Sequence, residues 1–202
     1  MDNLKVVVKV GGSLFDWPAL GQRLEHWLKT LPSSWVLLVP GGGPTVDVIR
    51  NFERQHGLGE ESAHWLALRA LSVSAHFLAA ALSSRKSSRP TVIADLQDAE
   101  AVWDQRGLPI LDPFRFAQQD EDRPGRLPHS WSVTSDSLAA RVAMRFQAQK
   151  LILLKSIDIP NDWMKGERGI VDPYFEEIIR TDSQAIGSTL EVSALNFRGW
   201  RG

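Results

Sequence analysis

The sequence predicts a single α/β domain, a three-layer α/β/α sandwich whose central sheet is largely parallel. Short runs of β-branched and aliphatic residues alternate with segments of helical periodicity along the 202 residues. Several of these runs end in glycine, as strands do before a tight turn into a helix. No repeat, linker or change in composition divides residues 1–202, so we expect one domain rather than two.

The first half of the chain is expected to contain two strands and three helices. The strands span residues 4–10 and 35–39, and the helices span residues 17–31, 45–56 and 61–82. Both strands are rich in valine and leucine and run into glycine. Pro18 suits the first turn of the first helix, and Gly57 suits the end of the second. The third helix is apolar and suits either the core or a subunit interface, but polar residues such as Arg69 interrupt it, so we expect it not to cross a membrane.

The second half continues the alternation of strands and helices. Strands are expected at residues 91–94, 109–111, 150–154 and 189–195, the last at a sheet edge, and helices at residues 96–105, 135–148 and 173–179. Thr134 or Ser135 suits the N-cap of the helix that follows them. Residues 118–128 are polar, with a run of charges from Asp120 to Arg126, and we expect them to form a mobile surface loop. Strands and helices in this order form right-handed βαβ units, with helices on both faces of the sheet.

The composition excludes several classes of function. Lys and Arg number 23 against 24 Asp and Glu, which gives a net charge of -1 and no general attraction to nucleic acid or anionic lipid. The absence of cysteine excludes disulfides, iron–sulfur clusters, cysteine nucleophiles and zinc sites built on cysteine. The five histidines lack the close spacing to carboxylates of a metal site, so we expect no protein-held metal. The N-terminus lacks the features of a signal peptide, and we expect a cytoplasmic protein.

Two glycine turns carry the strongest indication of function. The segments Lys9-Val-Gly-Gly-Ser13 and Pro40-Gly-Gly-Gly-Pro44 each place glycine at the carboxyl end of an apolar strand, where ligands bind in open parallel sheets. Glycine lets backbone N–H groups approach phosphate oxygens, and the second turn leads into a helix whose N-terminus favours an anion. The spacing is that of neither a P-loop nor a dinucleotide-binding turn. Tight turns without a ligand are the alternative interpretation, which suits either turn alone better than both together.

These turns resemble the amino acid kinase family when they are read with the segment Val133-Thr-Ser-Asp-Ser-Leu-Ala-Ala140 and the strand that follows it. The family includes aspartate, acetylglutamate, glutamate 5-, carbamate and uridylate kinases, and the likeness extends from Lys9 to about Asp158. It implies a carbamate kinase-like fold, ATP and Mg²⁺ as cofactors, a small-molecule acceptor and a homodimer or larger homo-oligomer. Residues 127–137 and 63–67 further resemble a small branch of the family, which phosphorylates an aminomethylfuran methyl phosphate in methanofuran- and tetrahydromethanopterin-type coenzyme biosynthesis.

The resemblance implies roles for individual residues. Lys9 would contact the transferred phosphoryl group, and Asp136 would orient the catalytic lysines, unless it serves only as a carboxylate at a helix N-terminus. The nucleotide would meet Gly11, Gly12, Ser13, Ser156 and Asp158. The acceptor and the transferred phosphoryl group would meet Gly41, Gly42 and Gly43. Further candidates for acceptor contacts, with solvated, packing or capping roles as the alternatives, are Arg50, His64, His129, Trp131, Thr134 and Ser135.

The sequence departs from the family pattern in two places. Many relatives carry a second catalytic lysine in a Gly-Gly-Met…Lys segment, which residues 166–173 lack. Lys155, Lys165 or Arg168 would then provide the second cation. Lys155 ranks first because it ends a strand, with an ordinary solvated lysine as the alternative. The turn at 154–158 also replaces the more usual Thr-Asp-x-x-Gly turn, which leaves the nucleotide preference open.

Tryptophan is unusually frequent, with 8 Trp against 1 Tyr. Trp17, Trp27 and Trp35 suit packing positions, whereas Trp65 and Trp131 lie beside the segments that the resemblance places at the acceptor. A flat aromatic wall there suits a furan ring, and a cation–π contact suits its aminomethyl group. The sequence thus predicts an ATP-dependent kinase that phosphorylates a phosphate or carboxylate, with the aminomethylfuran phosphate as first candidate. An aspartate-, acetylglutamate- or uridylate-type kinase, a nucleotide- or oxyanion-binding protein without activity and a structural protein are the alternatives.

Overall fold

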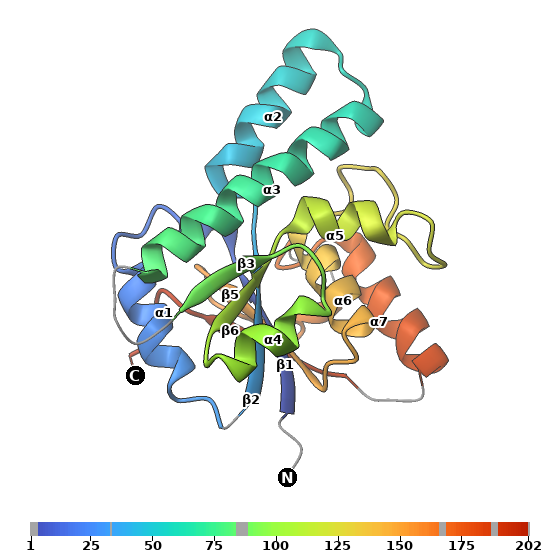
Figure 1. Ribbon diagram of the computed structural model, residues 1–202. Helices are drawn as coiled ribbons and strands as arrows, with labels where there is room; N and C mark the ends of the chain where they lie inside the picture. The colour runs from blue at the N-terminus through green and yellow to red at the C-terminus, as the bar shows by residue number, and fades with distance from the viewer. Residues whose placement is uncertain (1–3, 33, 84–88, 166–168, 187–189, 202) are drawn as a thin grey trace.

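A six-stranded parallel sheet forms the centre of the protein (Figure 1), as the sequence predicts. The computed structural model describes residues 4–32, 34–83, 89–165, 169–186 and 190–201. The strands are β1 (Leu4–Val10), β2 (Ser34–Pro40), β3 (Pro90–Ile93), β4 (Leu108–Leu111), β5 (Lys150–Lys155) and β6 (Glu191–Asn196). They lie in the order β3-β4-β2-β1-β5-β6, which makes β6 an edge strand, as predicted.

Helices cover both faces of this sheet. They are α1 (Leu20–Leu28), α2 (Gly43–His56), α3 (Glu60–Ser83), α4 (Asp98–Asp104), α5 (Pro113–Asp120), α6 (Ser135–Arg145) and α7 (Pro173–Ile186), with short 3₁₀ turns η1 (Gly12–Leu14) and η2 (Trp163–Lys165). One core cluster joins α1 and the C-terminal half of α3 to Val6 and Val8 of β1. A second cluster joins α4, α6 and α7 to Val7 on the opposite face. These are the three layers that the sequence predicts.

The direction of each connection decides which face its helices cover. The connections from β1 to β2 and from β2 to β3 run toward the β3 edge and place α1 and the C-terminal half of α3 on one face. The remaining connections run toward the β6 edge and place α4, α6 and α7 on the other face, as right-handed crossovers require. The chain therefore leaves the neighbouring strands β1 and β5 toward opposite faces. This opens a crevice at their carboxyl ends, the usual ligand site of such sheets.

Helix α5 corrects the start of the surface loop predicted over residues 118–128, because the helix continues to Asp120, whereas residues 122–126 are exposed as expected. The Asp112 carboxylate caps this helix by accepting hydrogen bonds from two N–H groups of its first turn, at 3.0 and 3.3 Å. Asp120, which was expected in solvent, is only 5% exposed. Its carboxylate accepts hydrogen bonds from Arg141 of α6 at 2.7 and 3.0 Å. The start of the charge run is therefore buried and anchored, because a basic residue of a distant helix neutralises it.

Several predicted boundaries also shift. Helix α1 begins at Leu20 rather than at residue 17, and Pro18 lies in the turn before it instead of in its first turn. Helix α6 ends at Arg145, three residues early, and α7 continues to Ile186, beyond the predicted end. The first residue of the predicted strand at 189–195 lies outside the described residues.

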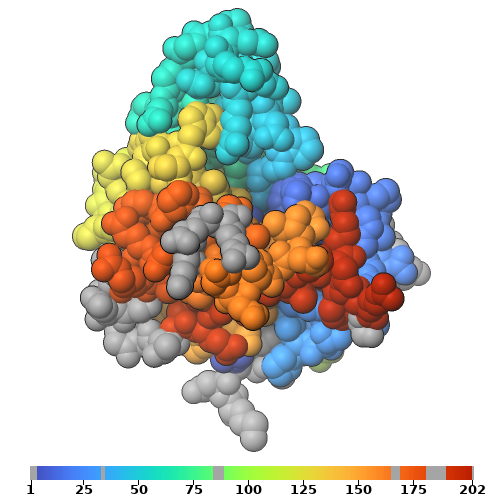
Figure 2. All heavy atoms as spheres, turned by 180° about the vertical axis from the view of Figure 1, so that it is seen from behind, coloured from blue at the N-terminus to red at the C-terminus, as the bar shows by residue number. Residues whose placement is uncertain are grey.

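The α2–α3 hairpin stands out from the rest of the molecule (Figures 1 and 2). Helix α3 is the one described helix that is long and apolar enough to cross a membrane by length and composition, and a core helix passes the same test. Leu71, Leu78 and Leu82 are buried in the core clusters, whereas Val73 and Phe77 are exposed. Helix α3 thus serves as a core helix and also leaves apolar side chains on the surface.

Candidate active site

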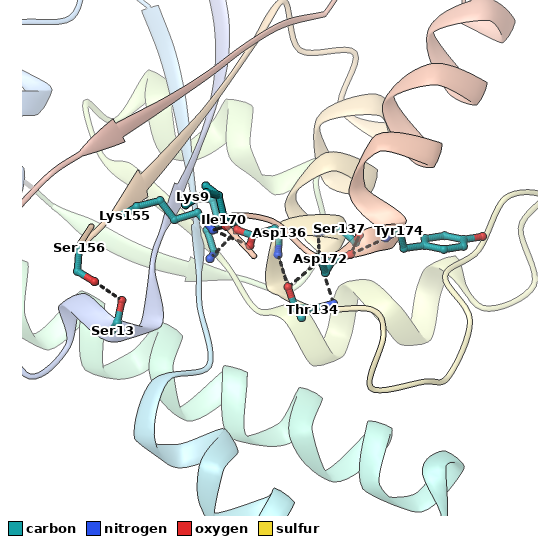
Figure 3. Close-up of polar contacts among 10 residues, drawn as sticks. All are labelled: Lys9, Ser13, Thr134, Asp136, Ser137, Lys155, Ser156, Ile170, Asp172 and Tyr174. Carbon is teal, nitrogen blue, oxygen red and sulfur yellow. Dashed lines mark hydrogen bonds and ion pairs between the residues drawn. The ribbon is translucent and has the colours of Figure 1, made fainter. Parts of the chain in front are cut away.

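Three charged side chains meet at the carboxyl ends of β1 and β5 (Figure 3). Lys9 Nζ lies 2.8 Å from Oδ1 of Asp136, and Lys155 Nζ lies 2.6 Å from Oδ2. Lys9, Asp136 and Lys155 are 4%, 6% and 9% exposed. Lys155 also donates a hydrogen bond to the carbonyl of Ile170 at 2.5 Å. Two ammonium groups against one carboxylate leave a buried net charge of +1, which favours an anionic ligand. We call these three residues the Lys–Asp–Lys group.

Strand geometry aims both lysines at the same side of the sheet. Side chains alternate along a strand, so Lys9 shares a face with Val7, and Lys155 shares a face with Leu153. Val7 and Leu153 both belong to the core cluster under α6. Asp136 lies in the first turn of α6, where the helix dipole stabilises a carboxylate. The sheet and one helix N-terminus therefore bring the three charges together.

Burial disfavours the charged form of these groups. For Asp136, burial acts to raise the pKa, but the charges of Lys9 and Lys155 outweigh it and hold the pKa below its ordinary value. Burial, and then the neighbouring charge of Lys9, lower the pKa of Lys155 to about 8. The other two predicted sources of a second cation are not placed, since Arg168 and the side chain of Lys165 lie outside the described residues.

Asp172 fixes the turn that carries Asp136 (Figure 3). Its Oδ2 accepts hydrogen bonds from the hydroxyl of Thr134 at 2.7 Å and from the backbone N–H of Ser137 at 3.2 Å. Its Oδ1 accepts from the Ser137 hydroxyl at 2.5 Å and from the N–H of Tyr174 at 3.1 Å. Thr134 is the N-cap of α6, which decides between the two predicted caps. Sequence reasoning missed Asp172, although an aspartate directly before Pro173 is a recognisable helix start.

The two glycine turns approach each other closely. A Cβ atom at Gly12 would lie 2.1 Å from the backbone nitrogen of Gly43, and one at Gly41 would lie 2.4 Å from that of Gly12. Gly43 also has a φ of 57°, in the left-handed region that favours glycine. Any side chain at Gly12 or Gly41 would force the turns apart. Close packing of the two turns thus requires glycine at these positions, in addition to the predicted need for backbone N–H groups to approach a phosphate.

Four backbone N–H groups of these turns donate to no acceptor among the described residues. They belong to Gly12, Ser13, Gly42 and Gly43. Gly11 and Gly41 instead donate to carbonyl groups of neighbouring strands, at 2.9 and 2.8 Å. Because an unpaired N–H group is a ready partner for an anion, the first four can cradle phosphate oxygens.

The predicted nucleotide contacts lie at the crevice between β1 and β5. The hydroxyl oxygens of Ser13 and Ser156 are 2.7 Å apart (Figure 3). Asp158 is exposed, and its carboxylate accepts a hydrogen bond from the side-chain amide of Asn196 at 2.7 Å. Arg198 donates to the carbonyl of Ser13 at 3.4 Å. Sequence reasoning missed Asn196 and Arg198, because only the pairing of β6 with β5 brings them to this crevice.

A cavity of about 290 Å³ opens between the glycine turns, α2, α3 and the N-terminus of α6. Figure 2 shows a hollow where the α2–α3 hairpin, in cyan, meets the segment near residue 130, in yellow. Predicted site residues that line it are Gly12, Ser13, Gly42, Gly43, Arg50, His64, Trp131, Thr134 and Ser135. The guanidinium carbon of Arg50 lies 4.9 Å from the centre of a Trp131 ring, so the protein's own cation occupies this cation–π position.

Two aromatic residues that were expected at the acceptor lie behind the cavity wall instead. The ring of His129 stacks on His64, with ring centres 4.5 Å apart, and Trp65 meets the His129 ring at 5.2 Å. His129 Nδ1 lies 2.6 Å from a carboxylate oxygen of Glu61, and its Nε2 lies 3.0 Å from one of Glu121. Neither His129 nor Trp65 is among the residues that line the cavity. The sequence does not reveal that His129 packs against His64 and Trp65, because this contact depends on the path of the loop after α5.

Comparisons with known proteins point to one family. The model of the amino acid kinase family matches residues 5–160. The (5-(aminomethyl)furan-3-yl)methyl phosphate kinase of Methanocaldococcus jannaschii is 23% identical over 153 residues. That match covers 75% of this chain and 66% of the relative, just under two thirds of its length.

Solved structures share the fold at low identity. The UMP kinase of Bacillus anthracis has a TM-score of 0.64 at 12% identity, covering 97% of each chain. The uridylate kinase of Archaeoglobus fulgidus has a TM-score of 0.58 at 18% identity, covering 95% of this chain and all of that one. The UMP kinase of Ureaplasma parvum has a TM-score of 0.56 at 17% identity, covering 77% of this chain and 68% of that one. The family model matches well over half of the residues of this chain, and the chain therefore belongs to the amino acid kinase family.

Proposed function

We propose that this chain is an ATP-dependent kinase that transfers the γ-phosphoryl group to a phosphate or carboxylate of a small acceptor. The observation that carries the proposal is the buried, net positive Lys–Asp–Lys group beside two turns with unpartnered N–H groups. Phosphoryl transfer depends on in-line alignment and on positive charge around the moving group more than on covalent help from the protein. The lysines and the turns supply that charge and those donors.

The proposed step moves one phosphoryl group. An acceptor oxygen forms a bond to the γ-phosphorus, the bond from that phosphorus to the β–γ bridging oxygen breaks, and ADP leaves. Lys9 and Lys155 face the charge of the transferred group, while Asp136 holds both ammonium groups in place. Among the described residues, no three His, Asp or Glu side chains are grouped to hold a metal ion. We therefore expect Mg²⁺ to arrive on the phosphates of ATP, which are its usual ligands and whose charge it neutralises.

For the acceptor we propose (5-(aminomethyl)furan-3-yl)methyl phosphate, which the name of the Methanocaldococcus jannaschii relative gives as its substrate. The cavity of about 290 Å³ is at the lower end of the range of about 300–1,000 Å³ for small-molecule sites, which favours a compact acceptor. Arg50 offers a guanidinium to a phosphate group, and Trp131 offers an aromatic wall to a ring. A cytoplasmic location and a homo-oligomeric state, both expected above, stay predictions.

Mixing the protein with ATP, Mg²⁺ and single acceptors tests this function directly. We expect ADP release with the aminomethylfuran phosphate, and phosphorus NMR of the product should show a new diphosphate. UMP, aspartate and acetylglutamate serve as competing acceptors from the same family. Turnover with one of these alone would replace the proposed acceptor, and ATP binding without turnover on any acceptor would favour a binding protein.

The variant W131A is expected to raise the KM for the acceptor about tenfold, with the KM for ATP unchanged. The reason is the loss of the ring wall and of the support for Arg50, each worth about 0.5–1.5 kcal/mol. W131F keeps a smaller ring and should show a smaller effect. Steady-state kinetics with varied acceptor give the comparison, and an unchanged acceptor KM in W131A would show that Trp131 forms no wall of the acceptor site.

The rate constant kcat/KM for ATP is expected to fall as the pH rises through about 8. Lys155, with a pKa lowered to about 8, loses its positive charge in the free enzyme above that pH. K155R keeps its charge throughout, so its rate is expected to be lower but its profile flat over the same range. Initial rates of ADP release across this range give both profiles. If kcat/KM for ATP falls with the same midpoint in K155R, a group other than Lys155 is responsible for the pH dependence.

A further inference from the structure

His64 lies on the wall of the acceptor cavity, away from the glycine turns. It belongs to the face of α3 that also presents Leu68 and Leu71 to the cavity. Leu71 reaches Gly42 and lies seven residues along the helix from His64, about 10 Å at 1.5 Å per residue. The ring nitrogens of His64 have no hydrogen-bond partner among the described residues. The far end of the cavity therefore presents an imidazole that is free to bind a ligand.

A second histidine lies behind this wall, between two carboxylates. Both ring nitrogens of His129 contact carboxylate oxygens, Nδ1 that of Glu61 at 2.6 Å and Nε2 that of Glu121 at 3.0 Å. Ionised carboxylates only accept hydrogen bonds, so each nitrogen of the His129 ring is placed to donate one. Arg126 pairs with Glu121 at 3.0 Å and, together with the His129 ring, offsets the two carboxylates. The side chains of Glu61 and Arg126 are 67% and 49% exposed, so solvent screens both of their charges.

Burial and the stacked His129 ring favour the neutral form of His64. Burial, and then the neighbouring charge of His129, lower the pKa of His64 to about 4, while Glu61 and Glu121 oppose this. Asp47 on α2 also lines the cavity. A neutral imidazole offers one lone pair and one N–H group, and its lone pair accepts a hydrogen bond from a cation without charge repulsion.

We propose that His64 determines acceptor specificity by accepting a hydrogen bond from a primary ammonium group at the end of the acceptor away from the transferred phosphoryl group. His129, held by Glu61 and Glu121, is a positioning residue that acts through His64. The inference rests on the proposed kinase function and adds the residue that would recognise the amine of the proposed acceptor. The glycine turns suit the anionic end, and the free lone pair of His64 at the far end of the cavity suits the ammonium end.

Two acceptors that differ only in the amine test this proposal. They are (5-(aminomethyl)furan-3-yl)methyl phosphate and its 5-methyl analogue, compared in the wild type, H64L, H64Q and H129Q. In H64L we expect the KM for the amine to rise about tenfold to a hundredfold, the range of a hydrogen bond to a charged group. The kcat, the KM for ATP and the KM for the methyl analogue should be unchanged. H64Q keeps an acceptor atom and should recover part of the loss, and H129Q should raise only the KM for the amine.

H76L is the matched control, because His76 lies on the same helix at an exposed position, and it should behave as the wild type. Equal losses for both acceptors in H64L and H64Q, or equal kcat/KM for both in the wild type, would overturn the proposal. Calorimetric binding of the two compounds without ATP separates this result from the kinase function. Preferential binding of the amine that H64L abolishes would support the inference even if no phosphoryl transfer occurs, and that lack of transfer would count against the proposed function alone.

Discussion

Replacing Lys9 with alanine is expected to lower kcat about a hundredfold to a thousandfold, the range found when one donor to a developing negative charge is removed. The ammonium group of Lys9 is buried at the end of β1 and lies 2.8 Å from Asp136. Because its contact with Asp136 holds the ammonium group in place, the transferred group would lose a preorganised positive charge. Single-turnover measurements with saturating ATP and acceptor report this change in the transfer step itself.

Lys5 provides the matched control for this variant. It lies on the same strand, at the opposite end of the sheet from the Lys–Asp–Lys group, with its ammonium over the ring of Phe146. We expect K5A to turn over at the wild-type rate, and K9A to bind ATP in spite of its slow transfer. A normal transfer rate in K9A would show that Lys9 has only a structural role and would remove the basis of the proposed mechanism.

The position of a site residue can be predicted from the sequence where it depends on the pattern of neighbouring residues. Lys9 and Lys155 end apolar strands, and Asp136 follows a capping threonine, so the rules for parallel sheets place all three at one edge. The catalytic roles assigned to them stay predictions. The network around Asp172 is different, because it joins the starts of α6 and α7. Asp172 is 38 residues from Thr134, whose hydroxyl donates a hydrogen bond to it. No local pattern shows that such distant segments meet.

The acceptor site shows a similar division. Arg50, His64 and Trp131 line the cavity, since each is close to an element that borders the glycine turns, and their predicted contact with an acceptor stays a prediction. His129 belongs to a loop whose path depends on helix α5, which the sequence analysis did not find. The pair formed by Asp120 and Arg141 anchors the start of that loop, and its long-range contact is invisible in a local reading of charges. Charged residues usually lie in solvent, but this expectation is wrong for Asp120.

The largest expected loss of stability follows from replacing Asp136 with asparagine, by about 3–5 kcal/mol. This substitution leaves the buried ammonium groups of Lys9 and Lys155 without the charged carboxylate that pairs with both of them. Transfer activity should be lost as well, because Lys155 would lose its proton at a lower pH than the wild type does. Urea denaturation at neutral pH measures the stability. D98N, in the exposed first turn of α4, is the control and should cost only about 0.3–1 kcal/mol.

The pH dependence of this stability has a defined sign. The pKa of Asp136 is lower in the folded protein than its ordinary value of 3.8, so its contribution is present above that value and is lost as the pH falls through the folded pKa. D136N should therefore lose less stability than the wild type between neutral pH and strong acid. Equal acid sensitivity, or a loss no larger than that of D98N, would show that Asp136 is not the counter-charge of the lysines.

A second substitution separates the charge of the Lys–Asp–Lys group from its structure. In the wild type the group carries a buried net charge of +1, whereas K155M leaves the neutral pair of Lys9 and Asp136. We therefore expect K155M to cost less stability than D136N, and the double variant K155M/D136N to recover part of the loss caused by D136N. Turnover should be impaired in all three variants. The surplus positive charge of the group would then lower the stability of the folded protein. Activity would require the same charge, because an incoming phosphate neutralises it.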